Sequence, residues 1–258
     1  MAFQLRIYSN NRNSKQIIGQ IRKELKSQAS AKTEKEKEKA ITIFGNETKL
    51  LALKLPETRK IAESFAKKLK EEKDFATALK VADELYKSGV FEEATVAESI
   101  LKEFKNYFDN STFDRFDEWI DYIKNWANID MLCGWLITPI ILKDESKIKI
   151  IFQWTKSKNR WRRRAAAVAL VKPVRKGMYL KQALRVAKKL IQDEDDMVQK
   201  GVGWLLKEAG GKFPDETIKF LMKWRPKISR LVLRLAYEKL PSKEKILGCE
   251  TKSVIEDS

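Results

Sequence analysis

Two side chains that can stabilise positive charge stand four positions apart in the segment Trp126-Ala-Asn-Ile-Asp130. The face of an indole attracts cations, and an ionised carboxylate in a basic protein attracts positive charge that develops on a substrate. Residues four apart share one face of a helix, so a helical segment would bring Trp126 and Asp130 to a common cavity. Structural roles are the alternative: Asp130 can compensate the dipole of a helix start, and Trp126 can be a buried core residue.

A run of cations follows further along the chain, between Lys156 and Arg164. Arginine and lysine bind phosphate oxygens, and a basic stretch with interleaved aromatic residues is typical of nucleic-acid binding. The expected contacts to a DNA backbone are Lys158, Arg160, Arg162, Arg163, Arg164 and Lys200. The alternative is a solvated charged surface without a partner.

Trp204 is a third aromatic candidate. Val198, Val202 and Leu205 recur at helical spacing and predict the core-facing stripe of a helix. Trp204 falls outside this stripe, and Gly201, one turn earlier, is expected to leave open space over the indole. Trp204 therefore suits a contact surface, although packing between neighbouring helices explains it equally well.

The chain as a whole is strongly basic. It has 53 Lys and Arg against 36 Asp and Glu, a formal net charge of +17 and a pI of about 9.7. Such a field attracts polyanions, so nucleic acid and an anionic membrane surface are the leading partners. No apolar run approaches the ~20 residues that span a bilayer, and the N-terminal segment lacks a signal-peptide core. We expect a soluble, cytoplasmic protein that binds no membrane.

Composition also excludes several kinds of chemistry. The chain has no histidine, which removes imidazole acid–base catalysis, histidine-activated nucleophiles and most transition-metal sites. Cys133 and Cys249 are the only cysteines and lack the spacing of a zinc site. We expect no metal and no other cofactor, so a reaction would depend on carboxylates, lysines or electrostatics.

The pattern of apolar residues predicts an all-α protein, because helical spacing recurs along a chain with only 10 glycines and 6 prolines. Helix pairs of roughly 30–40 residues stacked in line are typical of HEAT-like repeats, and we expect an α-solenoid with a concave basic groove. Residues 1–258 would form one domain, in which 1–40 supply an N-terminal helix and a Lys/Glu-rich segment that is a solvated helix or a linker. The predicted helices cover residues 15–28, 57–71, 74–87, 92–108, 113–125, 129–142, 145–155, 160–174, 178–192, 195–209, 213–223 and 226–239.

The order and spacing of the three segments resemble the AlkD-like alkylpurine DNA glycosylases, the DNA alkylation repair family built from HEAT-like repeats. The matching residues are Trp126, Asp130, Arg164 and Trp204, and the resemblance covers approximately residues 45–240. It implies that both tryptophans and Asp130 form the active cleft. It also implies that Arg164 helps to hold the DNA backbone.

The function implied by this resemblance is hydrolysis of the N-glycosidic bond of N3- or N7-alkylated purines in duplex DNA, by a monomer. Such a purine is already cationic and leaves as a neutral base, so a chain without histidine is compatible with the reaction. Ala127 is a departure, because members of the family often carry a second aromatic residue there. The main alternative is a non-catalytic HEAT-like-repeat protein that binds distorted or branched DNA, and a scaffold for acidic proteins is a third.

Overall fold

The computed structural model of the chain describes residues 2–240, with side chains described from residue 13 onward. The regular elements of this part are all helices, and one isolated β-bridge joins Lys49 to Val90. The helices form two compact units that divide between Glu145 and Ser146. The sequence predicts that residues 1–258 form one domain, which would require the two units to be joined into a single body, and this stays a prediction.

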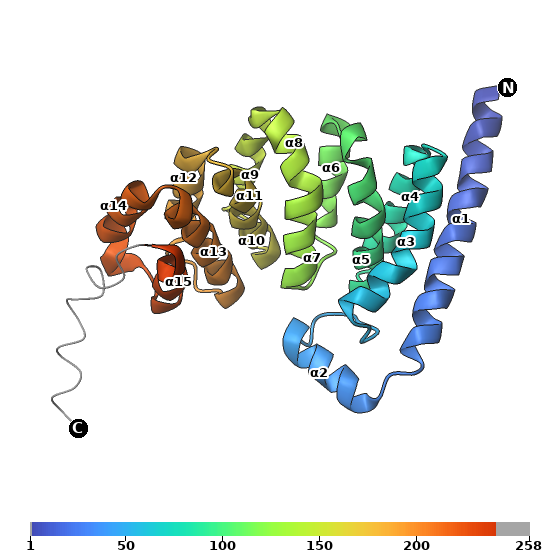
Figure 1. Cartoon of the computed structure of the whole chain (residues 1–258), viewed down its shortest axis with the longest axis horizontal. Coiled ribbons are helices and arrows are strands. Elements are labelled where there is room, and N and C mark those ends of the chain that lie inside the picture. The colour runs from blue at the N-terminus through green and yellow to red at the C-terminus, as the bar shows by residue number, and fades with distance from the viewer. Residues whose placement is uncertain (1, 241–258) are drawn as a thin grey trace. The chain divides into compact units, whose positions relative to one another are not determined.

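The first unit is built around helix α5 (Phe91–Leu101), every residue of which is buried. Helices α3, α4 and α7 pack against α5, and α1 packs against α4 (Figure 1). In chain order the elements are α1 (Ala2–Ala29), α2 (Glu34–Phe44), α3 (Leu55–Glu71), α4 (Phe75–Lys87), α5, η1 (Lys102–Tyr107), α6 (Asn110–Trp119), α7 (Trp126–Met131), η2 (Leu132–Ile137) and α8 (Thr138–Lys143).

Carboxylates on the buried helix α5 hold neighbouring segments in place. Glu92 accepts hydrogen bonds from the backbone N–H groups of Leu51 and Leu53, at 2.9 and 3.1 Å. Glu93 pairs with Arg22 of α1, with a shortest N–O distance of 2.9 Å. Buried charges are stable only when they are paired or hydrogen-bonded in this way, so these contacts fix α1 and the segment before α3 against the core.

The second unit is arranged around helix α13 (Asp196–Lys212), against which its other long helices pack (Figure 1). Val198, Val202 and Leu205 are fully buried, which confirms the predicted core stripe of this helix. The remaining elements are η3 (Glu145–Lys147), α9 (Ile148–Trp154), α10 (Arg160–Val168), α11 (Val171–Arg175), α12 (Leu180–Leu190), α14 (Pro214–Trp224), η4 (Arg225–Lys227), α15 (Arg230–Ala236) and η5 (Tyr237–Lys239).

The all-α solenoid class predicted from the sequence is confirmed, and most predicted helices appear near their expected positions. Two differences follow from proline. The predicted helix 160–174 is broken after Val168, because Pro173 has no N–H and its ring clashes with the carbonyl of Ala169. In the same way, Pro139 accompanies a π-helical turn in η2, where the N–H of Thr138 donates to the carbonyl of Cys133.

The N-terminal part of the chain is more ordered than its sequence indicates. The helix predicted at 15–28 extends from Ala2 to Ala29, and the Lys/Glu-rich segment forms helix α2. Helix α2 starts with a capping box, in which the side chain of Thr33 accepts from the N–H of Glu36 and the Glu36 carboxylate accepts from the N–H of Thr33. No helix in the described residues is long and apolar enough to cross a membrane.

Candidate functional site

Trp126 and Asp130 lie one turn apart on helix α7 of the first unit. The helix begins at Trp126 because the side chain of Asn125 accepts a hydrogen bond from the N–H of Asn128, at 2.8 Å, and so caps the helix. Both Trp126 and Asp130 are half-buried, which leaves part of each side chain accessible. The structure therefore brings these two predicted site residues together on one short helix.

Helix α2 positions the indole of Trp126. The ring of Phe44 stacks on Trp126 with centroids 6.0 Å apart, and the indole Nε1–H donates to the carbonyl of Ile43 at 3.2 Å. Phe44 is itself packed on Phe91 of the central helix α5, at 4.3 Å. One face of the Trp126 indole is thus covered, and its orientation is fixed by a segment whose role the sequence left open.

A second carboxyl group, Glu98, is buried within electrostatic reach of Asp130. The Tyr86 hydroxyl donates to Glu98 at 3.0 Å. Burial raises the pKa of Glu98 well above its ordinary value, the negative charge of Asp130 raises it further, and the Arg59 guanidinium opposes the shift. Burial therefore favours the neutral form of Glu98.

Two cations close to this helix were missed by the sequence analysis. The guanidinium of Arg59 lies 5.4 Å from the ring centroid of Trp135, and the ammonium of Lys102 lies 5.2 Å from it. Arg59 also contacts the sulfur of Met131, at 3.9 Å, directly after Asp130. No spacing in the sequence indicates this cluster, because Arg59, Lys102 and Trp135 belong to three different elements.

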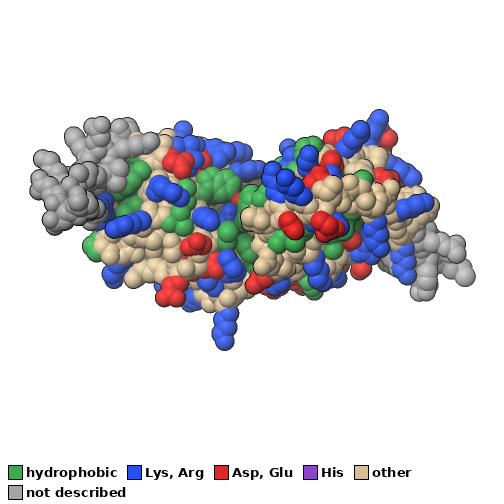
Figure 2. Space-filling model, turned by 90° about the horizontal axis from the view of Figure 1, so that it is seen from below, with side chains coloured by type: hydrophobic (Ala, Val, Ile, Leu, Met, Phe, Trp, Pro, Cys, Tyr) green, Lys and Arg blue, Asp and Glu red, His purple; other side chains and the backbone are tan. Residues whose placement is uncertain are grey.

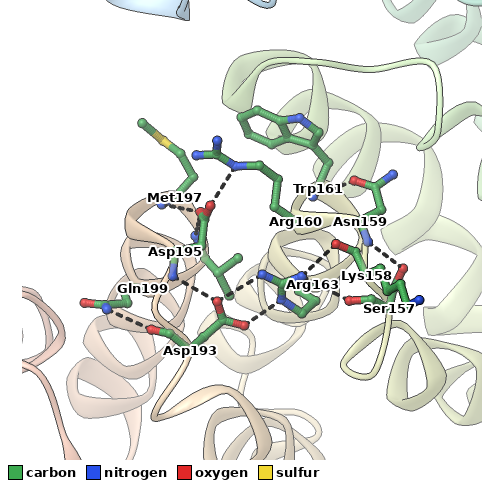
Figure 3. A network of polar contacts seen from close by, with 11 residues as sticks. Ser157, Lys158, Asn159, Arg160, Trp161, Arg163, Asp193, Asp195, Met197 and Gln199 are labelled. Carbon is green, nitrogen blue, oxygen red and sulfur yellow. Dashed lines mark hydrogen bonds and ion pairs between the residues drawn. The ribbon is translucent and has the colours of Figure 1, made fainter.

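Two of the predicted DNA-binding arginines of the second unit, Arg160 and Arg163, belong to an internal network of polar contacts (Figure 3). Arg163 pairs with Asp193 at 2.6 Å and donates to the carbonyls of Ser157 and Lys158, both at 3.0 Å. Arg160 pairs with Asp195 at 2.8 Å. These contacts tie the start of α10 to the turn before α13, so Arg163 in particular has a structural task.

Arg164 packs between helices α10 and α13. It is only 5% exposed, and its guanidinium donates to the carbonyl of Met197. A Cβ atom on Gly201 would lie 3.3 Å from Cγ of Arg164 and 3.7 Å from Cγ2 of Val168. The expectation that Gly201 leaves space over Trp204 was wrong, because Gly201 is buried and serves the close approach of α13 to α10.

The other predicted residues of this unit are more accessible. Lys158 and Lys200 are exposed, and Arg162 and Trp204 are half-buried. Lys158 immediately precedes α10, and Lys200 lies in the first turns of α13, so both are near the helix starts that the arginine network joins. Among the described residues, no cluster of Cys, Asp or Glu has the arrangement of a metal site.

Positive charge is distributed over both units. Figure 2 shows one face of the molecule, on which Lys and Arg side chains are interspersed with fewer Asp and Glu. The basic surface and the stacked helices together define this molecule as a basic, all-α protein of the helical-repeat class. The chain belongs to the family described as DNA alkylation repair enzyme, whose model matches residues 21–240. The resemblance found in the sequence covered approximately residues 45–240, whereas the family model also matches the second part of α1 and all of α2.

Solved structures show the same fold. A predicted DNA alkylation repair enzyme from Enterococcus faecalis is 15% identical, with a TM-score of 0.71 over 81% of this chain and 97% of that chain. AlkD2 from Streptococcus mutans is 22% identical, with a TM-score of 0.55 over 73% of this chain and 91% of that chain. A comparison with curated proteins found no match. At these identities, the structural likeness supports the fold alone.

Proposed function

We propose that this chain is a DNA glycosylase that hydrolyses the N-glycosidic bond of N3- or N7-alkylated purines in duplex DNA. Its membership in the DNA alkylation repair enzyme family supports a role in alkylation repair. The finer assignment depends on one observation, the pairing of half-buried Trp126 and Asp130 on one turn of α7. An indole and a carboxylate are the two groups that a cationic substrate needs.

The substrate decides what the protein must supply. An N3- or N7-alkylated purine carries positive charge, so the bonding electrons pass to the base, which leaves neutral, and positive charge develops on the deoxyribose. No general acid has to protonate the leaving group, which fits a chain without histidine. Water then adds to C1′ and loses a proton, and an abasic site remains.

Asp130 would stabilise the developing positive charge on the sugar and orient the attacking water. A carboxylate about 4 Å from a unit positive charge contributes roughly 4 kcal/mol at an effective dielectric constant of 20. Since about 1.4 kcal/mol is a factor of ten in rate, this is nearly three orders of magnitude. A cation–π contact contributes only about 0.5–2 kcal/mol, so Asp130 should dominate catalysis.

The aromatic and basic residues would hold the substrate. Because Phe44 covers one face of Trp126, the lesion or its sugar would contact the other face. Trp204 of the second unit is proposed as a further aromatic contact. Lys158, Lys200, Arg160 and Arg162 are proposed as contacts to the DNA backbone, and Arg163 and Arg164 as residues that hold the start of α13 in place.

A single-turnover assay on a duplex with one 7-methylguanine tests this assignment. Asp130→Asn should release the base roughly 1,000-fold more slowly than the wild type. Glu63→Gln changes an exposed carboxylate on α3 and should leave the rate unchanged. Equal rates for Asp130→Asn and the wild type would remove Asp130 from the mechanism. Duplex binding without any base release by the wild type would favour the non-catalytic alternative.

A further inference from the structure

A small hollow with a basic lining lies in the second unit, outside the residues assigned above. Its volume is about 190 Å³, and its lining comes from α9, the turn that follows α9, and α12. The residues are Phe152, Gln153, Thr155, Lys156, Arg185 and Lys189. Three of these six side chains are cations and none is an acid, which gives the hollow a positive potential.

The cations of the hollow are available to a ligand. Lys156, Arg185 and Lys189 are exposed, and within residues 13–240 no carboxylate pairs with them. Arg185 lies over the ring of Phe152, with 4.5 Å to the centroid, so its guanidinium is held in place without being neutralised. This differs from Arg163 and Arg160, whose charges are paired with aspartates (Figure 3).

Helix α12 keeps its positive charge at a cost to its own stability. Its charged residues are Lys181, Arg185, Lys188 and Lys189, and it has no acid. Lys181, Arg185 and Lys189 are spaced at i, i+4, where each like-charged pair destabilises a helix by a few tenths of a kcal/mol. A cation of this row that neutralises a DNA phosphate would release counterions that are condensed on the DNA.

The hollow is also close to the helix starts already described. The end of α9 leads through Lys156 to the start of α10, and the end of α12 leads through Asp193 to the start of α13. Since Arg163 joins these two connections, a strand that contacts Lys158 next to α10 would continue past Lys156. The hollow therefore adjoins the connection that carries Lys158.

We propose that the hollow between α9 and α12 binds a phosphate group of the DNA backbone, through Lys156, Arg185 and Lys189. This assignment rests on the proposed function in that its partner is duplex DNA. The hollow is smaller than the pockets of about 300 Å³ or more that enclose a whole small ligand, so it fits a single phosphate of a polymer better. It supplies backbone contacts that the paired Arg163 and the buried Arg164 do not.

Binding of an undamaged duplex, measured by fluorescence anisotropy over a range of salt concentrations, tests this proposal. The variant is Arg185→Gln/Lys189→Gln. Its control, Lys219→Gln/Lys223→Gln, removes two exposed cations with the same i, i+4 spacing from α14 of the same unit. The variant should bind about 3- to 30-fold more weakly than the control. Its log–log salt slope should be shallower by about 0.9, the change expected for the loss of one phosphate contact.

Affinity and salt slope equal to those of the control would overturn the proposal, as would a wild type that binds polyglutamate but not the duplex. Matching far-ultraviolet circular dichroism and thermal unfolding midpoints confirm that the variants are folded. Because no base is released from undamaged DNA, this result is independent of the glycosylase assay. If the wild type releases no base from a methylated duplex but Arg185→Gln/Lys189→Gln still binds DNA more weakly than the control, the glycosylase activity is disproved and the phosphate site is retained.

Discussion

Asp130 lies near groups that the sequence did not connect with it. Glu98 lies 32 positions earlier and is fully buried, and the charge of Asp130 acts on it. Arg59 contacts Met131, the next residue, and lies over the ring of Trp135. The spacing of Trp126 and Asp130 could be read from the sequence because both belong to one turn, whereas these partners depend on packing between α3, α5 and α7.

Replacing Glu98 should change how stability depends on pH. The folded-state pKa of Glu98 is raised, so the folded protein holds this proton more tightly than the unfolded chain. Wild-type stability should therefore fall as the pH rises from about 4.3, the ordinary pKa, toward the folded-state value, by up to about 1.4 kcal/mol per pH unit. Glu98→Gln has no such proton and should gain stability relative to the wild type.

Urea unfolding of both proteins at pH 5 and pH 8 measures this effect. The free energy of unfolding of Glu98→Gln minus that of the wild type should be larger at pH 8. The amide oxygen of the Glu98→Gln side chain can still accept the hydrogen bond from Tyr86, so the variant should remain folded. A difference that is equal at the two pH values would contradict the assignment of a neutral, buried Glu98.

The indole of Trp126 should matter less than the charge of Asp130. Trp126→Ala removes a cation–π contact of about 0.5–2 kcal/mol, so the single-turnover rate should fall roughly 2- to 30-fold. Trp126→Phe keeps a ring against Phe44 but loses the hydrogen bond to the carbonyl of Ile43. Base release by Trp126→Phe should lie between the rates of Trp126→Ala and the wild type, and a loss as large as that of Asp130→Asn would assign the indole a greater role.

At the scale of elements, glycines set the distance between α13 and its neighbours. A Cβ atom on Gly203 would lie 2.7 Å from Cδ1 and 2.8 Å from Cβ of Leu235 on α15. Gly203→Ala should therefore lower the free energy of unfolding by about 1–3 kcal/mol. Gly19 of α1 has no atom within 4 Å of a built Cβ, so Gly19→Ala should be stabilising by about 0.5–1 kcal/mol.

Thermal or urea unfolding of the two glycine variants checks this contrast. Both substitutions add one methyl group to a helix, so helix propensity favours each of them equally. Only the close approach to Leu235 separates them. If Gly203→Ala were as stable as Gly19→Ala, the packing of α15 on α13 would be looser than described.

Most helices could be predicted because apolar residues recur at helical spacing and because capping residues mark the starts. Asp74 and Asp195 cap α4 and α13. The break before Pro173 was missed because the periodicity continues across it. Helix α2 agrees with the solvated-helix alternative for the Lys/Glu-rich segment, since none of its residues is buried, but its contact to the core through Phe44 was not predicted.

The candidate site was only partly predictable, for a similar reason. The run of closely spaced arginines indicated phosphate binding. In the structure, however, Arg163 pairs with Asp193 and Arg164 donates to the carbonyl of Met197, two partners about 30 positions away in the sequence. Two of the three cations of the hollow come instead from α12, a helix without an aromatic residue, and the third is Lys156 in the turn after α9. The aromatic residue of the hollow, Phe152, belongs to α9, so only the fold joins them.

For the molecule as a whole, charge and family agree. A net charge of +17 favours a polyanionic partner. Membership in the DNA alkylation repair family indicates that this polyanion is DNA with alkylation damage. The residues proposed for function lie in both units: Asp130 and Trp126 in the first, and the basic run and the hollow proposed to bind a phosphate in the second. We propose that these parts together release an alkylated base.

The most direct measurement is incubation of a duplex containing 7-methylguanine with the wild-type protein, followed by chromatography of the liberated material. We expect free 7-methylguanine together with an intact strand that breaks at the lesion only after alkali, because the product is an abasic site. Tight binding of the duplex with every base still attached, under conditions of excess enzyme, would contradict the proposed activity.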